Sequence, residues 1–219
     1  MTTDAPPVRR PRADAERNRR RVLDAASRVF AEHGPAATLG DVAQAAGVGI
    51  ATVYRNYPDR EALLDALFAD KIDTVLRVAV EAAELPDPGE AFRTYLMGII
   101  EVHAQDRSLA TVLFGPGRFD RFPPDLSDLL ATTADGLIDA AVAAGELRAG
   151  FTRQDTVALA VMVSGIAPAI RDVDPALWRR YAALVVDGTR PSASPEPLAP
   201  EPPAFRAVAE AMGRTLERP

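Results

Sequence analysis

The 219-residue sequence predicts an all-α protein, in which a small N-terminal three-helix domain is joined by a long helix to a C-terminal helical bundle. Apolar residues recur at helical spacing through most of the chain, and no useful length alternates apolar with polar residues. Thr38 with Asp41, and Thr152 with Asp155, have the spacing of the capping box that begins a helix. The Pro- and Gly-rich segment 85–89 is a clear break between helices.

The first 16 residues are predicted to form a disordered arm, because prolines are frequent and the apolar residues have no helical period. Arg9, Arg10 and Arg12 lie in it, and two interpretations stay open: an arm that reaches a DNA minor groove, or a solubilising tail. A helix to about His33 follows, with arginines 19–21 in its first turn. Cations in the first turn of a helix are destabilised by the positive end of the helix dipole, and DNA phosphates nearby would offset this cost.

Two short helices joined by a glycine turn are predicted within residues 38–57. The first begins with a capping box, and Gly47 is expected to end it in the left-handed conformation that glycine adopts without strain. The second spans 49–56 and is expected to bury Ile50 and Val53. This arrangement is typical of a helix-turn-helix, whose second helix enters the DNA major groove.

Charge is distributed unevenly along the chain. Residues 1–60 contain ten arginines and seven acidic residues, giving +3, whereas residues 61–219 contain fifteen basic and twenty-four acidic residues, giving −9. No acidic residue lies between Asp41 and Asp59, so the predicted second helix carries no carboxylate that would repel phosphate. This distribution favours a protein that binds DNA at one end only.

A dense and ordered pattern runs from about Arg19 to Ala66. Its members are Ala25, Ala26, Phe30, Gly34, Thr38, Asp41, Val42, Ala43, Ala46, Gly47, Val48, Thr52, Val53, Tyr54, Tyr57, Glu61, Ala62, Leu63 and Leu64. With this pattern the segment closely resembles the DNA-binding domain of the TetR family of transcriptional regulators. The resemblance implies an all-helical homodimeric repressor whose C-terminal domain binds a small molecule that releases DNA. The family usually has a small polar residue, a histidine and a phenylalanine where this chain has Gly49, Asn56 and Tyr57, so the resemblance does not imply the operator sequence.

The resemblance also implies which residues contact DNA. The positions that usually contact phosphate in the family correspond here to Thr38, Thr52, Tyr54 and Asn56, and Arg60 is similar to a commonly basic position. We expect the bases to be contacted by Arg55 and by the backbone of Gly49, Ile50 and Ala51.

A long helix is predicted from its N-cap Asp59 toward Glu84, followed by helices over about 90–103, 108–114, 124–144, 152–168 and 174–188. The long helix has roughly 25 residues and spans about 37 Å, enough to carry a displacement from a distal site to the head. We therefore expect a DNA-binding head over 17–60 and a regulatory and dimerisation domain over 61–190. Residues 191–203 contain six prolines and are expected to be an extended linker. Beyond it, the residues to 217 either dock as a short helix or are disordered.

An effector pocket in this body should be mostly apolar with a few polar groups that orient the ligand. His103 is the expected orienting group, and the alternative for each residue is packing in the core. The predicted lining residues are Phe92, Tyr95, Leu96, Ile99, His103, Phe114, Phe119 and Met162.

Two helix-turn-helix units about 34–36 Å apart would read successive major-groove faces, which predicts a two-fold homodimer. The family resemblance places the interface on the last two helices of the body. The predicted interface residues are Val157, Val161, Ser164, Leu177, Tyr181, Leu184 and Val185. The alternative is that part of this stripe belongs to the intramolecular core.

Other classes of function have little support in the sequence. It has no cysteine, only two histidines, no phosphate-binding glycine loop and no nucleophile motif, so we predict no catalytic residue, no metal site and no cofactor. No long apolar run or secretion signal is present, which predicts a cytoplasmic protein without a membrane partner. The prediction is a ligand-responsive DNA-binding regulator; the alternatives are an accessory DNA-associated protein without an effector and, more distantly, an enzyme that modifies small molecules.

Overall fold

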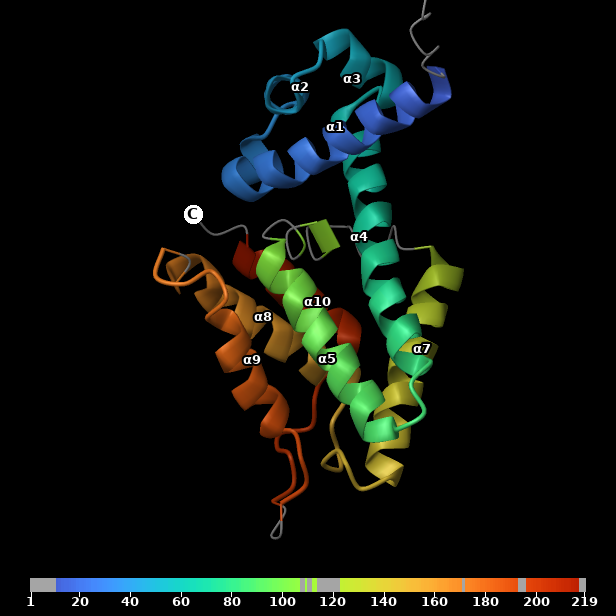
Figure 1. Cartoon of the computed structure of the whole chain (residues 1–219), viewed down its shortest axis with the longest axis vertical. Coiled ribbons are helices and arrows are strands. Elements are labelled where there is room, and N and C mark those ends of the chain that lie inside the picture. Colours follow the sequence, from blue (N-terminus) through green and yellow to red (C-terminus); the bar gives the residue numbers. More distant parts are fainter. Residues whose placement is uncertain are drawn as a thin grey trace, which may run out of the picture. The chain divides into compact units, whose positions relative to one another are not determined.

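The computed structural model describes residues 11–106, 109, 112–113, 123–170, 172–192 and 196–216, and none of these residues lies in a β-strand. The chain forms two compact units, Met1–Leu67 and Phe68–Pro219. The helix labels used below are those of Figure 1.

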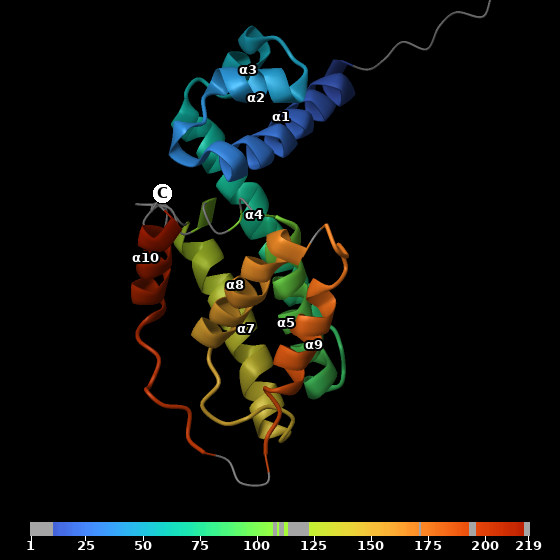
Figure 2. The ribbon, with the colours of Figure 1, turned by 90° about the vertical axis from the view of Figure 1, so that its left-hand side faces the viewer.

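The first unit contains α1 (Pro11–His33), the 3₁₀ turn η1 (Gly34–Ala36), α2 (Leu39–Ala46), α3 (Ile50–Asn56) and the start of α4 (Arg60–Ala83). In Figures 1 and 2, α2 and α3 lie together on one side of α1. Apolar side chains from all four helices form the core of the unit. Its buried members include Val22, Ala26, Val29, Phe30, Val42, Val53, Tyr57 and Leu63.

The start of α1 differs from the predicted disordered arm. The helix begins at Pro11, so residues 11–16 belong to it, whereas Arg9 and Arg10 lie outside the described residues. Proline is tolerated at the first helical position, and the alanines and charged residues after Pro11 are compatible with a helix, so Pro11 marks a helix start. The rest of the predicted arm, residues 1–10, lies outside the described residues. Arginines 19–21 therefore lie in the middle of α1, and the argument from the helix dipole does not apply to them.

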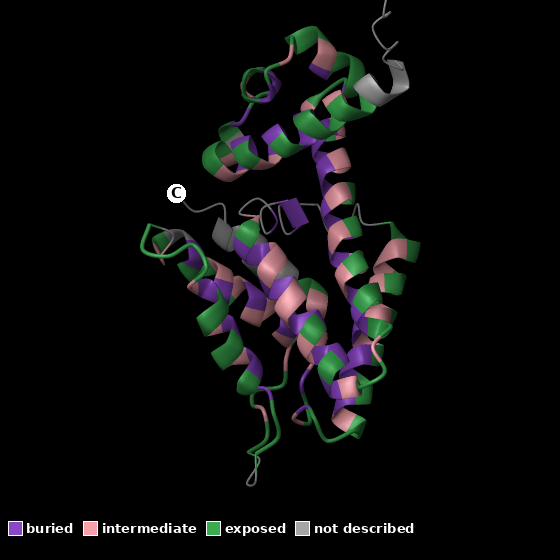
Figure 3. Cartoon of the chain, in the orientation of Figure 1, coloured by how far each residue is buried: buried purple, intermediate pink, exposed green. Residues whose placement is uncertain are grey.

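The second unit is a helical bundle built from the remainder of α4, α5 (Pro88–Gln105), α7 (Pro124–Ala143), α8 (Arg153–Ile170), α9 (Trp178–Asp187) and α10 (Phe205–Leu216). Helix α5 packs against α7, α8 and α9. Figure 3 shows buried positions along α5. Among them, Phe92, Leu96, Ile99 and Ile100 are each at most 2% exposed. The core of this unit is therefore organised around α5.

Helix boundaries in the second unit follow local signals. Asp87 caps α5 by accepting a hydrogen bond from the Glu90 N–H at 2.6 Å. Asp59 does the same for α4, accepting from the Ala62 N–H at 2.7 Å. At the start of α8, the Asp155 carboxylate accepts from both the N–H and the hydroxyl of Thr152, each at 2.8 Å.

Two predicted boundaries are wrong. Helix α8 continues past Pro168 to Ile170. Helix α9 begins at Trp178 rather than next to Asp174, whose carboxylate instead closes a turn by accepting from the Ala176 N–H at 2.8 Å.

The C-terminal residues form a helix, α10, after an extended Pro-rich segment. The docking helix is thus the correct alternative for residues 205–216. The predicted short helix over 108–114 and the glycine loop after it lie largely outside the described residues. Within the described ranges, no helix is both long and apolar enough to cross a membrane.

Candidate nucleic-acid interface and ligand cavity

The turn between α2 and α3 is set by residues at both ends of α2. Thr38 Oγ1 accepts a hydrogen bond from the Asp41 N–H at 3.2 Å, and Asp41 Oδ2 accepts from the Thr38 N–H at 2.9 Å. These bonds form the predicted capping box. The Thr38 hydroxyl also donates to Asp41 Oδ2 at 2.7 Å, and this bond, followed by the one from the Thr38 N–H, holds the pKa of Asp41 below its ordinary value. Gly47 closes the helix at φ 63°, the left-handed region that favours glycine. The helix-turn-helix is confirmed.

Arg21 also holds this turn, a role that the sequence analysis missed. Its Nη2 donates to the Ala46 carbonyl at 2.7 Å, one of the carbonyls left without an intrahelical partner at the end of α2. A Cβ atom at Gly47 would lie 3.2 Å from the same Nη2 atom. Arg21 therefore fixes α2 against α1, and only the contact across 25 residues could have revealed this.

Helix α3 exposes one face almost completely. Val53 is fully buried, as predicted, but Ile50 is 43% exposed, so the prediction that it packs inward is wrong. The helix has only seven residues and Ile50 is its first, so a single central position meets the core. Ile50, Ala51 and the half-exposed Tyr54 instead join the surface on which base contacts were predicted.

Polar groups on α3 are positioned by bonds within the helix. Arg55 donates from Nε to the Ala51 carbonyl at 3.2 Å and from Nη2 to Thr52 Oγ1 at 3.0 Å. Asn56 Nδ2 donates to the Thr52 carbonyl at 2.8 Å. All three bonds are exposed, so exchanging them for bonds to water or to a nucleic acid has a small net cost.

Two further predicted contacts flank α3. Gly49 is the N-cap of α3 and has no side chain to occupy the first backbone N–H groups of the helix. Arg60 lies in the first turn of α4, donates from Nε to the Ala37 carbonyl at 3.3 Å and packs 5.1 Å from the centre of the Phe30 ring. Arg60 thus helps to join α4 to η1, whereas the bonds that Arg55 makes to described residues lie within its own exposed helix.

The second unit encloses a cavity of about 300 Å³. Its walls come from α4, α5, α7, α8 and α10, together with Leu113. The lining residues are Ile72, Val75, Tyr95, Ile99, His103, Leu113, Ser127, Asp128, Leu130, Ala131, Ala134, Arg153, Val157 and Phe205. Most of these are apolar and a few are polar, as in small-molecule sites of proteins.

His103 is 5% exposed, and its Nδ1 lies 2.9 Å from the Ile99 carbonyl oxygen. Burial lowers the pKa of His103, although the backbone bond and Asp106 act in the opposite direction. Burial likewise raises the pKa of Tyr95, so its hydroxyl stays protonated. The two groups therefore present uncharged, hydrogen-bonding atoms within an apolar wall.

Arg153 connects the cavity to the C-terminal tail. Its Nε lies 2.9 Å from Asp135 Oδ1, and its guanidinium lies 5.7 Å from the centre of the Phe205 ring. Gln154 donates to the Pro203 carbonyl at 3.2 Å, which anchors the segment that precedes α10. Phe205 is thereby held as one wall of the cavity.

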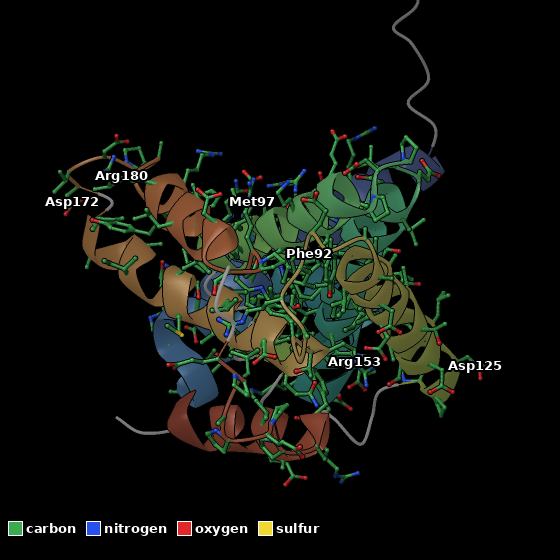
Figure 4. All side chains as sticks on the ribbon, turned by 90° about the horizontal axis from the view of Figure 1, so that it is seen from below. Phe92, Met97, Asp125, Arg153, Asp172 and Arg180 are labelled. Atoms are coloured by element: carbon green, nitrogen blue, oxygen red, sulfur yellow. The ribbon has the colours of Figure 1, made fainter. Side chains whose placement is uncertain are left out.

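Three of the predicted pocket residues, Tyr95, Ile99 and His103, line the cavity. Phe92 and Leu96 do not, because both are core residues, and the Phe92 ring packs edge-on against Phe151 at 5.3 Å. Figure 4 shows Phe92 in the interior of the bundle, with Arg153 on a neighbouring helix.

The other predicted pocket residues are Met162, Phe114 and Phe119. Met162 is 68% exposed and is absent from the cavity lining, and Phe114 and Phe119 lie outside the described residues. The residues that the prediction missed include Ile72 of α4 and Phe205 of α10, two helices that supplied no predicted lining residue.

The predicted interface residues fall into three groups. Leu184 is 62% exposed on α9. Val157 lines the cavity, in agreement with the alternative that part of the stripe is intramolecular. The others are partly buried: Val161, Ser164, Leu177, Tyr181 and Val185.

One unit has a helix-turn-helix whose second helix is exposed, and the other unit has a mostly apolar cavity. Together these features define a DNA-binding transcriptional regulator with a helical C-terminal domain. Residues 22–67 match the family model of bacterial regulatory proteins of the tetR family, and residues 87–191 match that of the SbtR-like transcriptional regulator C-terminal domain. A solved TetR transcriptional regulator from Streptomyces coelicolor is 34% identical, with a TM-score of 0.54 over 80% of this chain and 99% of that chain. This chain belongs to the TetR family, which is a family of transcriptional regulators and not of enzymes.

Curated relatives match mainly the first unit. The transcriptional repressor LfrR of Mycolicibacterium smegmatis is 52% identical over 69 residues, which are 32% of this chain and 35% of LfrR. The regulator AcrR of Shigella flexneri is 29% identical over 97 residues, 43% of this chain and 45% of AcrR. The chain thus spans less than half the length of these two relatives. A structure of LfrR from Mycobacterium smegmatis in complex with proflavine is 29% identical, with a TM-score of 0.59 over 78% of this chain and 92% of that chain.

Proposed function

We propose that this protein is a ligand-responsive repressor that binds a palindromic operator as a homodimer in the cytoplasm. The observation that carries the proposal is that one helix, α4, serves both units. Its first residues belong to the helix-turn-helix unit, whereas Ile72 and Val75 line the cavity. A ligand that displaces these two side chains therefore acts directly on the helix that continues into the DNA-binding unit.

The relatives support the repressor and the ligand. LfrR is named a repressor, and its solved structure contains proflavine, a small aromatic molecule. The cavity described above is of the size and apolar character that a small effector needs. An accessory DNA-binding protein without an effector would have no use for such a cavity, so the regulator is favoured over that alternative.

The surface of α8 and α9 supports the homodimer. Met162 and Ile166 on α8 and Leu184 on α9 are large apolar residues that are 68%, 37% and 62% exposed. Exposed apolar residues of this size on two packed helices are typical of an interface with another chain. Leu184→Glu should give a monomer in analytical ultracentrifugation, whereas Val173→Glu, at an 80% exposed turn position, should remain dimeric. A dimeric Leu184→Glu protein would place the interface elsewhere.

The experiment that tests the function begins with selection of an operator from random DNA by the full-length protein. Operator affinity is then measured by fluorescence anisotropy with and without proflavine and the members of a small-molecule library. An effector should weaken DNA binding by about 1–3 kcal/mol. His33→Gln, on the exposed C-terminal turn of α1, is a control that should leave the ligand response unchanged. A selected operator whose affinity no cavity-binding compound changes would refute ligand control and favour the accessory protein.

A further inference from the structure

The hydrogen-bonding state of His103 is fixed by its own helix. The ring approaches the Ile99 carbonyl oxygen through Nδ1 at 2.9 Å. A carbonyl oxygen only accepts hydrogen bonds, so Nδ1 carries the hydrogen and donates it. In the neutral ring Nε2 is then left with a lone pair and acts as an acceptor. This atom is buried and has no hydrogen-bond partner among the described residues.

A buried acceptor without a partner is costly, and it is uncommon in folded proteins. His103 lines the cavity, and Nδ1 is turned toward the backbone of α5. The Nε2 lone pair diverges from the Nδ1–H bond and faces away from the Ile99 carbonyl, so a molecule held in the cavity that His103 lines can supply the missing hydrogen.

Charged groups from several helices lie around the cavity. Asp106, in the turn after α5, pairs with Lys71 of α4, and Arg153 of α8 pairs with Asp135 of α7. Asp128 of α7 also lines the cavity. Burial lowers the pKa of His103, so protonation of the ring requires a pH below the range in which an exposed histidine titrates.

We propose that the cavity takes a compact, mostly apolar molecule that donates an O–H or N–H hydrogen bond to His103 Nε2, such as a phenol, an alcohol or an amine. The inference rests on the proposed function, since it names the class of effector for the same cavity. A carboxylate does not fit His103, because its oxygens only accept and would face the Nε2 lone pair. An anionic ligand could pair with this histidine only by forcing the buried ring to take up a proton.

The test uses three probes with the same ring system: 2-naphthol, which donates a hydrogen bond, 2-methoxynaphthalene, which does not, and 2-naphthoate, which is anionic. Binding to the full-length protein is measured by isothermal titration calorimetry without DNA. At neutral pH, 2-naphthol should bind on the order of tenfold more tightly than the other two probes.

Two substitutions assign the difference to Nε2. His103→Leu should remove the advantage of 2-naphthol over 2-methoxynaphthalene. His103→Gln, which keeps an acceptor, should restore part of it, and this control also separates the lost bond from a general loss of packing. Phe92→Leu, in the core beside the cavity, should keep the preference for 2-naphthol.

The pH dependence gives an independent readout. Binding of 2-naphthol should be constant from pH 8 to about pH 6.5 and fall at lower pH as the ring becomes protonated. Tightest binding by 2-naphthoate, with affinity that rises as the pH falls, would overturn the proposal in favour of an anionic ligand. Equal binding of all probes by the wild type and His103→Leu, or no binding by any of them, would overturn it as well. None of these outcomes depends on DNA binding, so failure here is distinguishable from failure of the proposed regulatory function.

Discussion

Replacing Phe92 tests whether this side chain belongs to the core of the second unit and not to the wall of its cavity. The Phe92 side chain is 1% exposed, and its ring meets the Phe151 ring at 5.3 Å and 84°. Phe92→Ala removes a fully buried aromatic side chain and should destabilise the unit by about 3–5 kcal/mol. For a chain of this size each kcal/mol lowers Tm by about 2–4 °C, so Tm should fall by about 6–20 °C. Phe92→Leu keeps most of the apolar volume and loses mainly the edge contact, so its Tm should fall by about 2–5 °C.

Thermal unfolding followed by circular dichroism measures these shifts, and calorimetry with 2-naphthol measures binding at a temperature where each variant is folded. Because Phe92 is absent from the cavity lining, the affinity for 2-naphthol should change less than threefold in Phe92→Leu. An unchanged Tm together with lost binding would show that this ring contacts the ligand, which would refute its assignment to the core.

Three further predictions concern packing, pH and the tail. A Cβ atom at Gly98 would lie 2.5 Å from Val78 Cγ1, so Gly98→Ala should cost about 1–3 kcal/mol in a denaturant melt, and adding Val78→Ala should recover most of it. The pKa of Asp41 is lowered in the folded state by its bonds from Thr38, so its stabilising contribution is present above the pKa of the unfolded chain and is lost as the pH falls below about 4. Thermal melts should show this loss in the wild type and not in Asp41→Asn. Phe205→Ala removes one wall of the cavity and should weaken 2-naphthol binding several-fold in calorimetry, and equal affinity would show that the tail does not contribute to the site.

Local signals made the α2–α3 turn predictable. A capping box and a left-handed glycine act within a few residues, so Thr38, Asp41 and Gly47 alone indicated where α2 begins and ends. The exposure of Ile50 was not predictable in this way. Burial depends on what packs opposite a residue. Val53, in the middle of α3, meets the core and is fully buried, whereas Ile50, at the start of the helix, does not and is 43% exposed.

The cavity was only partly predictable because it combines one local stripe with distant walls. Tyr95, Ile99 and His103 follow each other at helical spacing on α5, so periodicity grouped them. The same periodicity also grouped Phe92, which meets Phe151 instead. Phe205 was missed because its contact with Arg153 spans more than fifty residues and crosses a Pro-rich segment.

The base preference of Arg55→Ala directly tests the assignment of the exposed face of α3 to DNA. The measurement is operator selection followed by anisotropy titrations of the selected site and of single-base variants, for the wild type, Arg55→Ala and Arg190→Ala. Arg190 is exposed just after α9, and Arg190→Ala removes the same charge from the other unit.

Arg55→Ala should weaken operator binding by about 1–3 kcal/mol and reduce discrimination at one or two base pairs. Arg190→Ala should bind like the wild type. If Arg55→Ala kept both the affinity and the base preference of the wild type, α3 would not read the operator through this face, and the central claim would be contradicted.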